Sequence, residues 1–352
     1  MLPVDVVLRT CTASDLDAAL ADGEIVEVEF QGGRAVALVD LAESEEMLAD
    51  GLASLAAENR LAVVVGPHAV GRSQALATAL GGVPAVVLED AHTVGVDDVL
   101  AAVEDLPEDS VLALSLDPAL PLAAVPGAVA LDLASSGACP VLKATMPPAR
   151  TALARARADV AAGHWFGTSA ADRSIVEVRV SGPDEALVRV GQLVGTSIPR
   201  AFDVPASEIA VLLAPGSLDP AAVQSALSAA GGEGGGSAVA RAAVVPLAGA
   251  AAGAAAAGPA VVPLAGAAAG AAAAGPAVVP LAGPLDRAWD AAVLVLGPPG
   301  PGFTRALVYA GLMAGEKHVS VVHGAEPAAL AAAMSGAPDR PRRTRLAALL
   351  SG

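Results

Sequence analysis

Residues 61–80, LAVVVGPHAVGRSQALATAL, decide the fold of this chain. An apolar run is followed by a glycine-bounded turn, GPHAVGRS, and then by a helical pattern. The turn differs in one residue from the template G-x-x-x-x-G-K-[ST], whose glycine amides surround phosphates, whose lysine reaches the outer phosphates and whose hydroxyl holds magnesium. Arginine stands at the lysine position. The residues that we expect to bind a nucleotide here are Gly66, Gly71, Arg72 and Ser73. The alternative is a strand-to-helix turn that is kept for packing alone.

A second set of polar residues follows the next apolar strand pattern. Residues 83–90 read as a buried strand that ends in Glu89 and Asp90, and a helical pattern at 96–106 leads to a further strand pattern at 110–118. Alternation of strands and helices at such short intervals predicts a parallel sheet. The turn after residue 65 and the two carboxylates would then share the carboxyl edge of that sheet, where ligands bind. One carboxylate could coordinate Mg²⁺ while the other orients water, although carboxylates at a strand end are also commonly just solvated.

The composition limits the classes of partner. The chain has 352 residues, enough for two domains or one large α/β unit, and only 2% of them are aromatic. The net charge of -17 opposes generic nucleic-acid binding, because Lys and Arg supply most non-specific affinity for phosphate backbones. Four arginines at 340–345 form the one evident basic cluster, and a solvated terminus is its commoner meaning.

Disulfides, metal centres built from Cys or His, and membrane spans are not indicated. Cys11 and Cys139 are far apart and lack C-x-x-C spacing, and His68 and His92 lack a third ligand at helix or strand spacing. The start, MLPVDVVLRTCTASD, has no pattern of a secretory signal, and the long apolar stretches are interrupted by Gly and Pro. We therefore expect a cytoplasmic protein.

The remaining patterns suggest three domains. Residues 1–58 combine a helix, a two-stranded hairpin ending near residue 41 and a second helix capped by Ser44, which resembles a small winged-helix element. Residues 59–170 hold the first α/β half, and residues 171–352 hold a second one. The second half is interrupted at 231–283, where AVVPLAGAAAGAAAAGP occurs twice in tandem and begins a third time at residue 277. A repeat so poor in large side chains predicts a flexible insert rather than a solenoid.

Taken in order, the segments resemble the RecD-type superfamily-one DNA helicases from about residue 14 onward. VVLEDAHTV is similar to the acidic motif of that family, residues 116–145 to its G-D-x-x-Q-L-P-like segment, and IPRAFDVPASEIAVLLAP to the start of its second motor domain. TRALVYAGLMAGEKHVSVVHG is similar to its final motif. The resemblance implies two RecA-like P-loop NTPase halves with parallel sheets after a winged-helix-like α+β element. It further implies ATP and Mg²⁺ as ligands, with Glu89 and Asp90 as catalytic residues, Asp117 binding nucleotide, and Ser73 and Asp90 holding the metal.

The departures from this family fall on catalytic positions. Besides Arg72 in place of lysine, Leu120 stands at the γ-phosphate glutamine, Pro147 at an arginine, and Ala314 at the arginine finger, which can be worth several powers of ten in turnover. The inserted DNA-contacting segments are also missing. We therefore expect a pseudo-helicase with weak or no ATP binding, weak or absent DNA binding, and an interaction or regulatory role with an unknown protein partner. The alternatives are an ATP-dependent DNA helicase or ATPase with unusual motifs, and a fold that binds no ligand.

Overall fold

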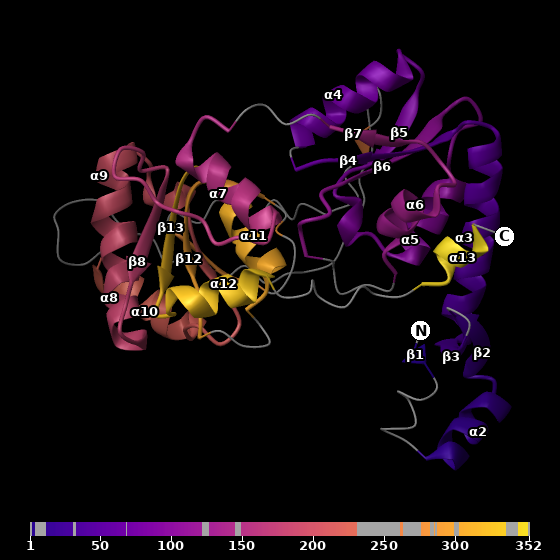
Figure 1. Cartoon of the computed structure of the whole chain (residues 1–352), viewed down its shortest axis with the longest axis horizontal. Helices are drawn as coiled ribbons and strands as arrows, with labels where there is room; N and C mark the ends of the chain where they lie inside the picture. The colour runs from indigo at the N-terminus through magenta and orange to yellow at the C-terminus, as the bar shows by residue number, and fades with distance from the viewer. Residues whose placement is uncertain are drawn as a thin grey trace.

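Two lobes, each built on a parallel sheet, make up most of the computed structural model, and a small antiparallel sheet lies near the N-terminus (Figure 1). The structure describes residues 2–3, 12–30, 33–67, 69–121, 127–144, 149–230, 261–262, 276–281, 285, 287–298, 303–335 and 344–350. The α/β class expected from the sequence is confirmed. Within these ranges no helix combines the length and the apolarity that crossing a bilayer demands.

The N-terminal element is a helix and a three-stranded antiparallel sheet in the order β1-β3-β2. Its parts are β1 (Leu2–Pro3), α2 (Ala13–Ala21), β2 (Ile25–Phe30) and β3 (Gly33–Leu38). The Thr12 side chain accepts a hydrogen bond from the backbone N–H of Asp15 and so caps α2. Whether this element is a winged helix stays a prediction.

A long helix, α3 (Val39–Ala57), follows β3 without a loop. The expected hairpin strand therefore ends three residues early, at Leu38, and the prediction that Ser44 caps the helix is wrong because Ser44 lies inside it. The physical reason is the packing of the first turn of α3 on the small antiparallel sheet. In the added first turn, Ala42 is buried against Val28, Ala35 and Ala37 of the small sheet, so tertiary packing extends the helix ahead of its local start signal.

The first parallel sheet has the strand order β10-β5-β6-β4-β7. Its strands are β4 (Leu61–Val65), β5 (Ala85–Leu88), β6 (Val111–Leu116), β7 (Val141–Lys143) and β10 (Val261–Val262). The helices between them are α4 (Ala69–Leu80), the short η1 (Ala91–Thr93), α5 (Val96–Glu104) and α6 (Val129–Ser136). Helices α3, α5 and α6 share one apolar cluster with the sheet, and Leu76 of α4 packs in another with Ala62 and Ala113. The strands are therefore covered on both faces, as parallel strands require.

The second parallel sheet has the order β11-β9-β12-β13-β8. Its strands are β8 (Ile175–Arg179), β9 (Ile209–Leu213), β11 (Ala277–Pro280), β12 (Trp289–Val295) and β13 (Gly315–His323). One face packs against α7 (Ala152–Ala161), α11 (Arg305–Met313) and α12 (Pro327–Ser335). The other face packs against α8 (Pro183–Gln192), the π-helical turn η2 (Leu193–Ser197), α9 (Ile198–Phe202) and α10 (Pro220–Ala230), and η3 (Ala206–Glu208) precedes β9.

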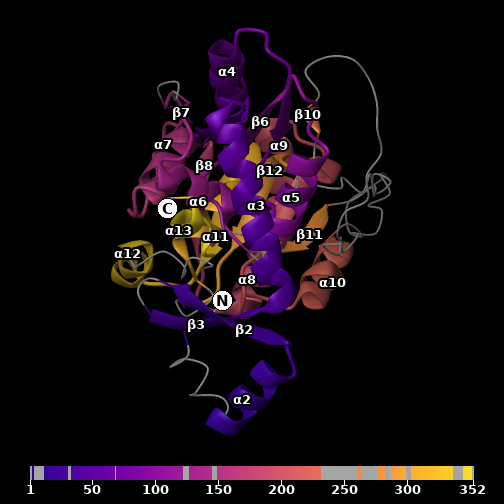
Figure 2. The same cartoon turned by 90° about the vertical axis from the view of Figure 1, so that its right-hand side faces the viewer.

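The chain crosses between the lobes more often than the expected domain boundaries imply. Helix α7 lies before the expected boundary at residue 170 but packs on the second sheet, beside α11. At the other end, α13 (Leu346–Leu349) returns to the first lobe and contacts α3 and α6, as the view in Figure 2 shows. Arg345 anchors this return, because it forms ion pairs with Glu45 and Glu46 of α3.

The expected flexible insert at 231–283 needs one correction. Its residues Ala277–Pro280 form strand β11, and Val278, Val279 and Leu281 are buried in the second lobe. These side chains are large enough to pack on the edge of β9, so the third start of the repeat belongs to the core. Apart from β10, the earlier part of the insert lies outside the described residues.

Candidate functional site

The turn between β4 and α4 is shorter than the phosphate-binding template suggests. Helix α4 begins at Ala69 rather than near Arg72, so only residues 66–68 separate it from the strand. The N–H of Gly66 donates to the carbonyl of Leu116 at the end of β6, at 3.1 Å. A Cβ atom on Gly66 would lie 2.6 Å from the Cβ of Ala144, so glycine is required for this close approach.

Arg72 points inward and is 2% exposed. Its Nε donates to Ser115 Oγ at 2.8 Å, its Nη1 to the carbonyl of Gly66 at 2.9 Å, and its Nη2 to Asp90 Oδ1 at 2.8 Å. All three guanidinium nitrogens are therefore bound to acceptors of the protein itself. The planar fork holds together the turn after β4, the middle of the sheet and the acidic end of β5.

The two carboxylates that follow β5 complete the same group. Glu89 accepts hydrogen bonds from Ser115 Oγ at 2.6 Å and from Ser73 Oγ at 3.3 Å, and it lies 3.7 Å from Nη2 of Arg72. The sequence-predicted residues Gly66, Arg72, Ser73, Glu89 and Asp90 are thus brought together. We call them, with Ser115, the Arg72 cluster.

The electrostatics of this cluster bear on whether it can hold Mg²⁺. Mg²⁺ takes oxygen ligands in an octahedron, and Ser73, Glu89 and Asp90 are ligands of that kind. However, Nη2 of Arg72 already lies within 4 Å of both carboxylates. A divalent cation in the same place would meet a fixed positive charge, so the residues in this arrangement do not fit a bound Mg²⁺. Among the described residues, no group of three or more His, Cys, Asp or Glu side chains could hold a metal ion.

His92 lies in η1, beyond the carboxylates, and is buried. Burial lowers the pKa of His92 to about 4; the Asp90 carboxylate opposes this shift and the Arg72 guanidinium adds to it. Its Nδ1 has no hydrogen-bond partner within the described part of the chain. His92 is therefore neutral at neutral pH and adds no charge to the cluster.

The side chain of Asp117, which is predicted to bind nucleotide, forms a hydrogen bond between the two lobes. Its Oδ1 accepts from the backbone N–H of Ala119 at 3.0 Å, and its Oδ2 accepts from the hydroxyl of Tyr309 at 2.8 Å. Asp117 directly follows β6 in the first lobe, whereas Tyr309 lies on α11 in the second, and both are buried. Burial and the nearby Asp117 carboxylate raise the pKa of Tyr309, so that its hydroxyl stays protonated and donates.

The three departures from the family pattern are placed differently. Leu120 packs against the apolar core of the second lobe. Ala314 is itself buried in that core, at the end of α11, where an arginine would be forced into an apolar environment. Pro147 lies outside the described residues.

Sequence reasoning missed Ser115 and Tyr309 as members of these contacts. Ser115 had a usable signal, because it is a hydroxyl residue inside the otherwise apolar strand VLALSL. A buried hydroxyl needs a partner, and such a position predicts a polar contact. Tyr309 is 192 residues from Asp117 and carries no comparable local signal.

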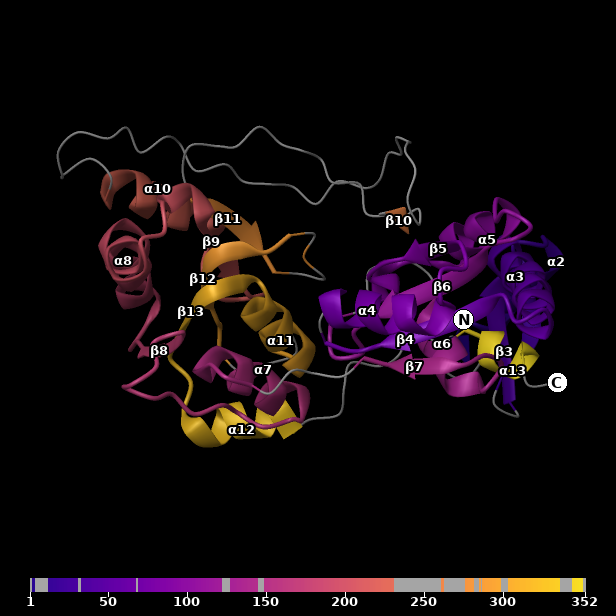
Figure 3. The same cartoon turned by 90° about the horizontal axis from the view of Figure 1, so that it is seen from above.

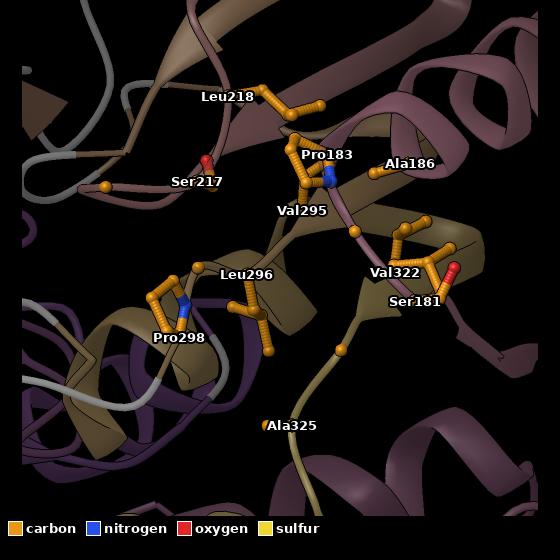
Figure 4. A pocket seen from close by; sticks show the side chains of 15 residues that line it. Ser181, Pro183, Ala186, Ser217, Leu218, Val295, Leu296, Pro298, Val322 and Ala325 are labelled. Carbon is orange, nitrogen blue, oxygen red and sulfur yellow. The ribbon is translucent and has the colours of Figure 1, made fainter.

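A separate cavity of 310 Å³ lies in the second lobe, at the carboxyl ends of β8, β9, β12 and β13 (Figure 4). It is lined by four glycines, by Ser181 and Ser217, and by apolar side chains such as Leu218 and Leu296. None of the sequence-predicted site residues reaches it. No charged side chain lines it either.

Comparisons with known proteins add little to this geometry. No family model matches the chain, and no curated protein matches it. Among solved structures, the chain is similar to the crystal structure of the Arterivirus nonstructural protein 10 (helicase), with a TM-score of 0.32 and 9% identity. That similarity covers 88% of this chain and 72% of the other. A TM-score this low supports no conclusion about fold or function.

Proposed function

We propose that this chain is a helicase-like P-loop protein that has lost the ATPase cycle and works through contact with another protein. The single observation that carries the proposal is the position of the Arg72 guanidinium, which is bound to Gly66, Ser115 and Asp90 at 2.8–2.9 Å. The proposed RecA-like character of the lobes is supported by their two parallel sheets. It is also supported by the turn after β4 and the carboxylates after β5, which meet at one edge of the first sheet.

The chemistry of arginine explains the loss. In a working phosphate loop a lysine ammonium reaches the outer phosphates while a metal ion bridges them to the carboxylates. Here one guanidinium satisfies the carboxylates directly and bonds the loop carbonyl of Gly66 as well. A nucleotide would have to break these contacts before Arg72 could face it. We therefore propose weak binding of ATP, without the support of Mg²⁺, and turnover near background.

The proposed partner is a protein rather than a nucleic acid. The net charge of -17 repels phosphate backbones, and Arg345, the only described member of the basic cluster at 340–345, is engaged with Glu45 and Glu46. Its charge is therefore neutralised within the chain.

The test combines nucleotide-binding calorimetry, with and without Mg²⁺, with an assay of phosphate release. For the wild-type chain we expect micromolar or poorer affinity, no gain on adding Mg²⁺, and no turnover above background. Arg72→Lys alone should not restore turnover, because Leu120 and Ala314 still offer no polar group. Arg189→Lys, on the exposed face of α8, is the matched control for a change from arginine to lysine.

Hydrolysis of ATP by the wild-type chain would contradict the proposal. Hydrolysis by the wild-type chain at about 1 s⁻¹ or faster, abolished by Asp90→Ala, would place the protein among working enzymes. The proposal would then be wrong, and the chain would be an ATPase with unusual motifs.

A further inference from the structure

The segment AVVPLAG occurs three times in the chain, at residues 243–249, 260–266 and 277–283. The third copy provides strand β11, at the edge of the second sheet. Residues 261–262 of the second copy form β10, at the edge of the first sheet, where Val261 pairs with Val87 of β5. The same Val-Val pair therefore lies along two different sheet edges, as Figure 3 shows.

The edge of β9 holds the third copy by its backbone and by alternate side chains. Four residues pair in parallel register, from Ala277 opposite Ala210 to Pro280 opposite Leu213, and the N–H of Leu281 donates to Leu213 at 2.8 Å. Val278 is 0% exposed and packs on the α8 and α10 side, whereas Val279 and Leu281 enter the core on the α11 side. Backbone pairing that gives affinity, with pockets for alternate side chains that give specificity, is the mode by which sheet edges bind extended peptides.

The second copy has every residue that this edge contacts. Pro259 precedes it as the buried Pro276 precedes the third copy, and the residues Ala-Val-Val-Pro-Leu follow in the same order. One difference lies downstream of the third copy, where Leu285 packs against the second-lobe core. The second copy is followed by alanine and glycine instead.

We propose that the edge of β9 is a binding groove for an extended Ala-Val-Val-Pro-Leu peptide, and that the repeats of this chain are alternative occupants of it. When the third copy is lost from the groove, the second copy replaces it, shifted by one repeat of 17 residues.

Chain connectivity allows the exchange. With the third copy in place, roughly 46 residues join α10 to the groove and about 8 join the groove to β12; with the second copy these connections become roughly 29 and 25 residues. Closure probability falls as about the 3/2 power of each length, so the second copy is disfavoured only about threefold. The contact of Leu285 adds to the preference for the third copy.

The test places a charge in the groove with and without spare copies. Val278→Asp puts an unpaired carboxylate in a fully buried position of the third copy, which is a strongly unfavourable change. In the full chain we expect the thermal midpoint to fall by only about 2–5 °C, because the second copy takes over. In a chain from which residues 243–276 have been deleted no spare copy remains, and the same substitution should lower the midpoint by about 10 °C or more. The deleted chain without the substitution is the reference for its own variant, because the deletion itself removes β10 and the buried Pro276.

Two further variants distinguish replacement of the third copy by the second from simple tolerance of a charge at position 278. Val211→Asp changes a fully buried position of β9 that no repeat can replace, so it should be equally harmful in both chains. A full-length chain with Val244→Asp, Val261→Asp and Val278→Asp together should lose as much as the deleted chain with Val278→Asp. An equal loss from Val278→Asp in the full and the deleted chains would overturn the proposal. A small loss in the triple variant would overturn it as well, because the groove would then not select valine.

Discussion

Replacing Arg72 by alanine should destabilise the protein and at the same time create a magnesium site. The substitution removes the N–H groups that donate to the Gly66 carbonyl and to Ser115 Oγ, and it leaves Glu89 and Asp90 without their cation. Removing one partner of a buried ion pair typically costs about 3–5 kcal/mol. Because the Asp90 side chain is 50% exposed, solvent screens part of this loss, and we expect a fall in unfolding free energy of about 2–3 kcal/mol.

Mg²⁺ should recover part of that loss in the variant only. The vacated position is surrounded by Ser73, Glu89 and Asp90, which supply oxygen ligands. With an affinity of about 1 mM, 10 mM Mg²⁺ would restore about 1.4 kcal/mol, whereas the wild-type chain should respond to Mg²⁺ only as it responds to NaCl of equal ionic strength.

The assay is urea denaturation followed by far-ultraviolet circular dichroism. Tryptophan fluorescence is unsuitable because Trp165 and Trp289 both pack in the second lobe, away from the Arg72 cluster. Arg155→Ala, at a half-exposed position of α7, is the control for loss of an arginine. An Arg72→Ala chain as stable as the wild type, or a wild-type chain stabilised equally by Mg²⁺, would refute the assignment of Arg72 as the cation of this site.

Two other predictions concern contacts between distant segments. Tyr309→Phe removes the hydroxyl that donates to Asp117 and should lower the unfolding free energy by about 1.5–3 kcal/mol in urea titrations, because the acceptor is a buried carboxylate; an unchanged midpoint would show that the lobes do not depend on this bond. Asp132→Asn should stabilise the protein at pH 7.5 by up to about 3 kcal/mol but not at pH 4. Burial raises the pKa of Asp132 to about 6, with repulsion from Glu45 adding and the Thr344 hydroxyl opposing. In the wild type the folded state thus keeps a proton that the unfolded state loses, so stability falls as pH rises from about 4 to 6. Equal pH profiles of wild type and variant, measured by thermal denaturation, would contradict this.

The sheet that carries the Arg72 cluster could be predicted from local patterns. Residues 61–65 form a strand as expected, and the strand expected at 83–90 is present at 85–88, because short β-branched runs bounded by glycine or proline suit a sheet that is buried on both faces. Parallel strands end at one edge, so the turn at Gly66 and the carboxylate of Asp90 had to come near each other. The strand pattern alone was sufficient for that proximity.

Other contacts could not be predicted because local sequence does not encode them. Asp117 and Tyr309 meet only when two lobes are assembled, and α7 joins the second sheet although it precedes the expected boundary. The repeat is an extreme case, since its copies are identical and only the second and third contribute to described strands. The third copy differs from the second in its short connection to β12 and in the contact of Leu285 with the second-lobe core. Both features lie outside the repeat, so the strand propensity of the repeat itself does not predict which copy pairs with β9.

The single change from lysine to arginine shows why charge alone does not define a phosphate site. Both side chains carry one positive charge, and the template would tolerate either if charge were sufficient. An ammonium is a compact point charge on a flexible stem, whereas the guanidinium is a planar fork that can bond several acceptors at fixed angles. At position 72 those acceptors are the Gly66 carbonyl, Ser115 and Asp90, and together they hold the fork inside the protein. We therefore propose that a residue that keeps the charge closes the site here, because its geometry favours the protein's own acceptors over an incoming phosphate.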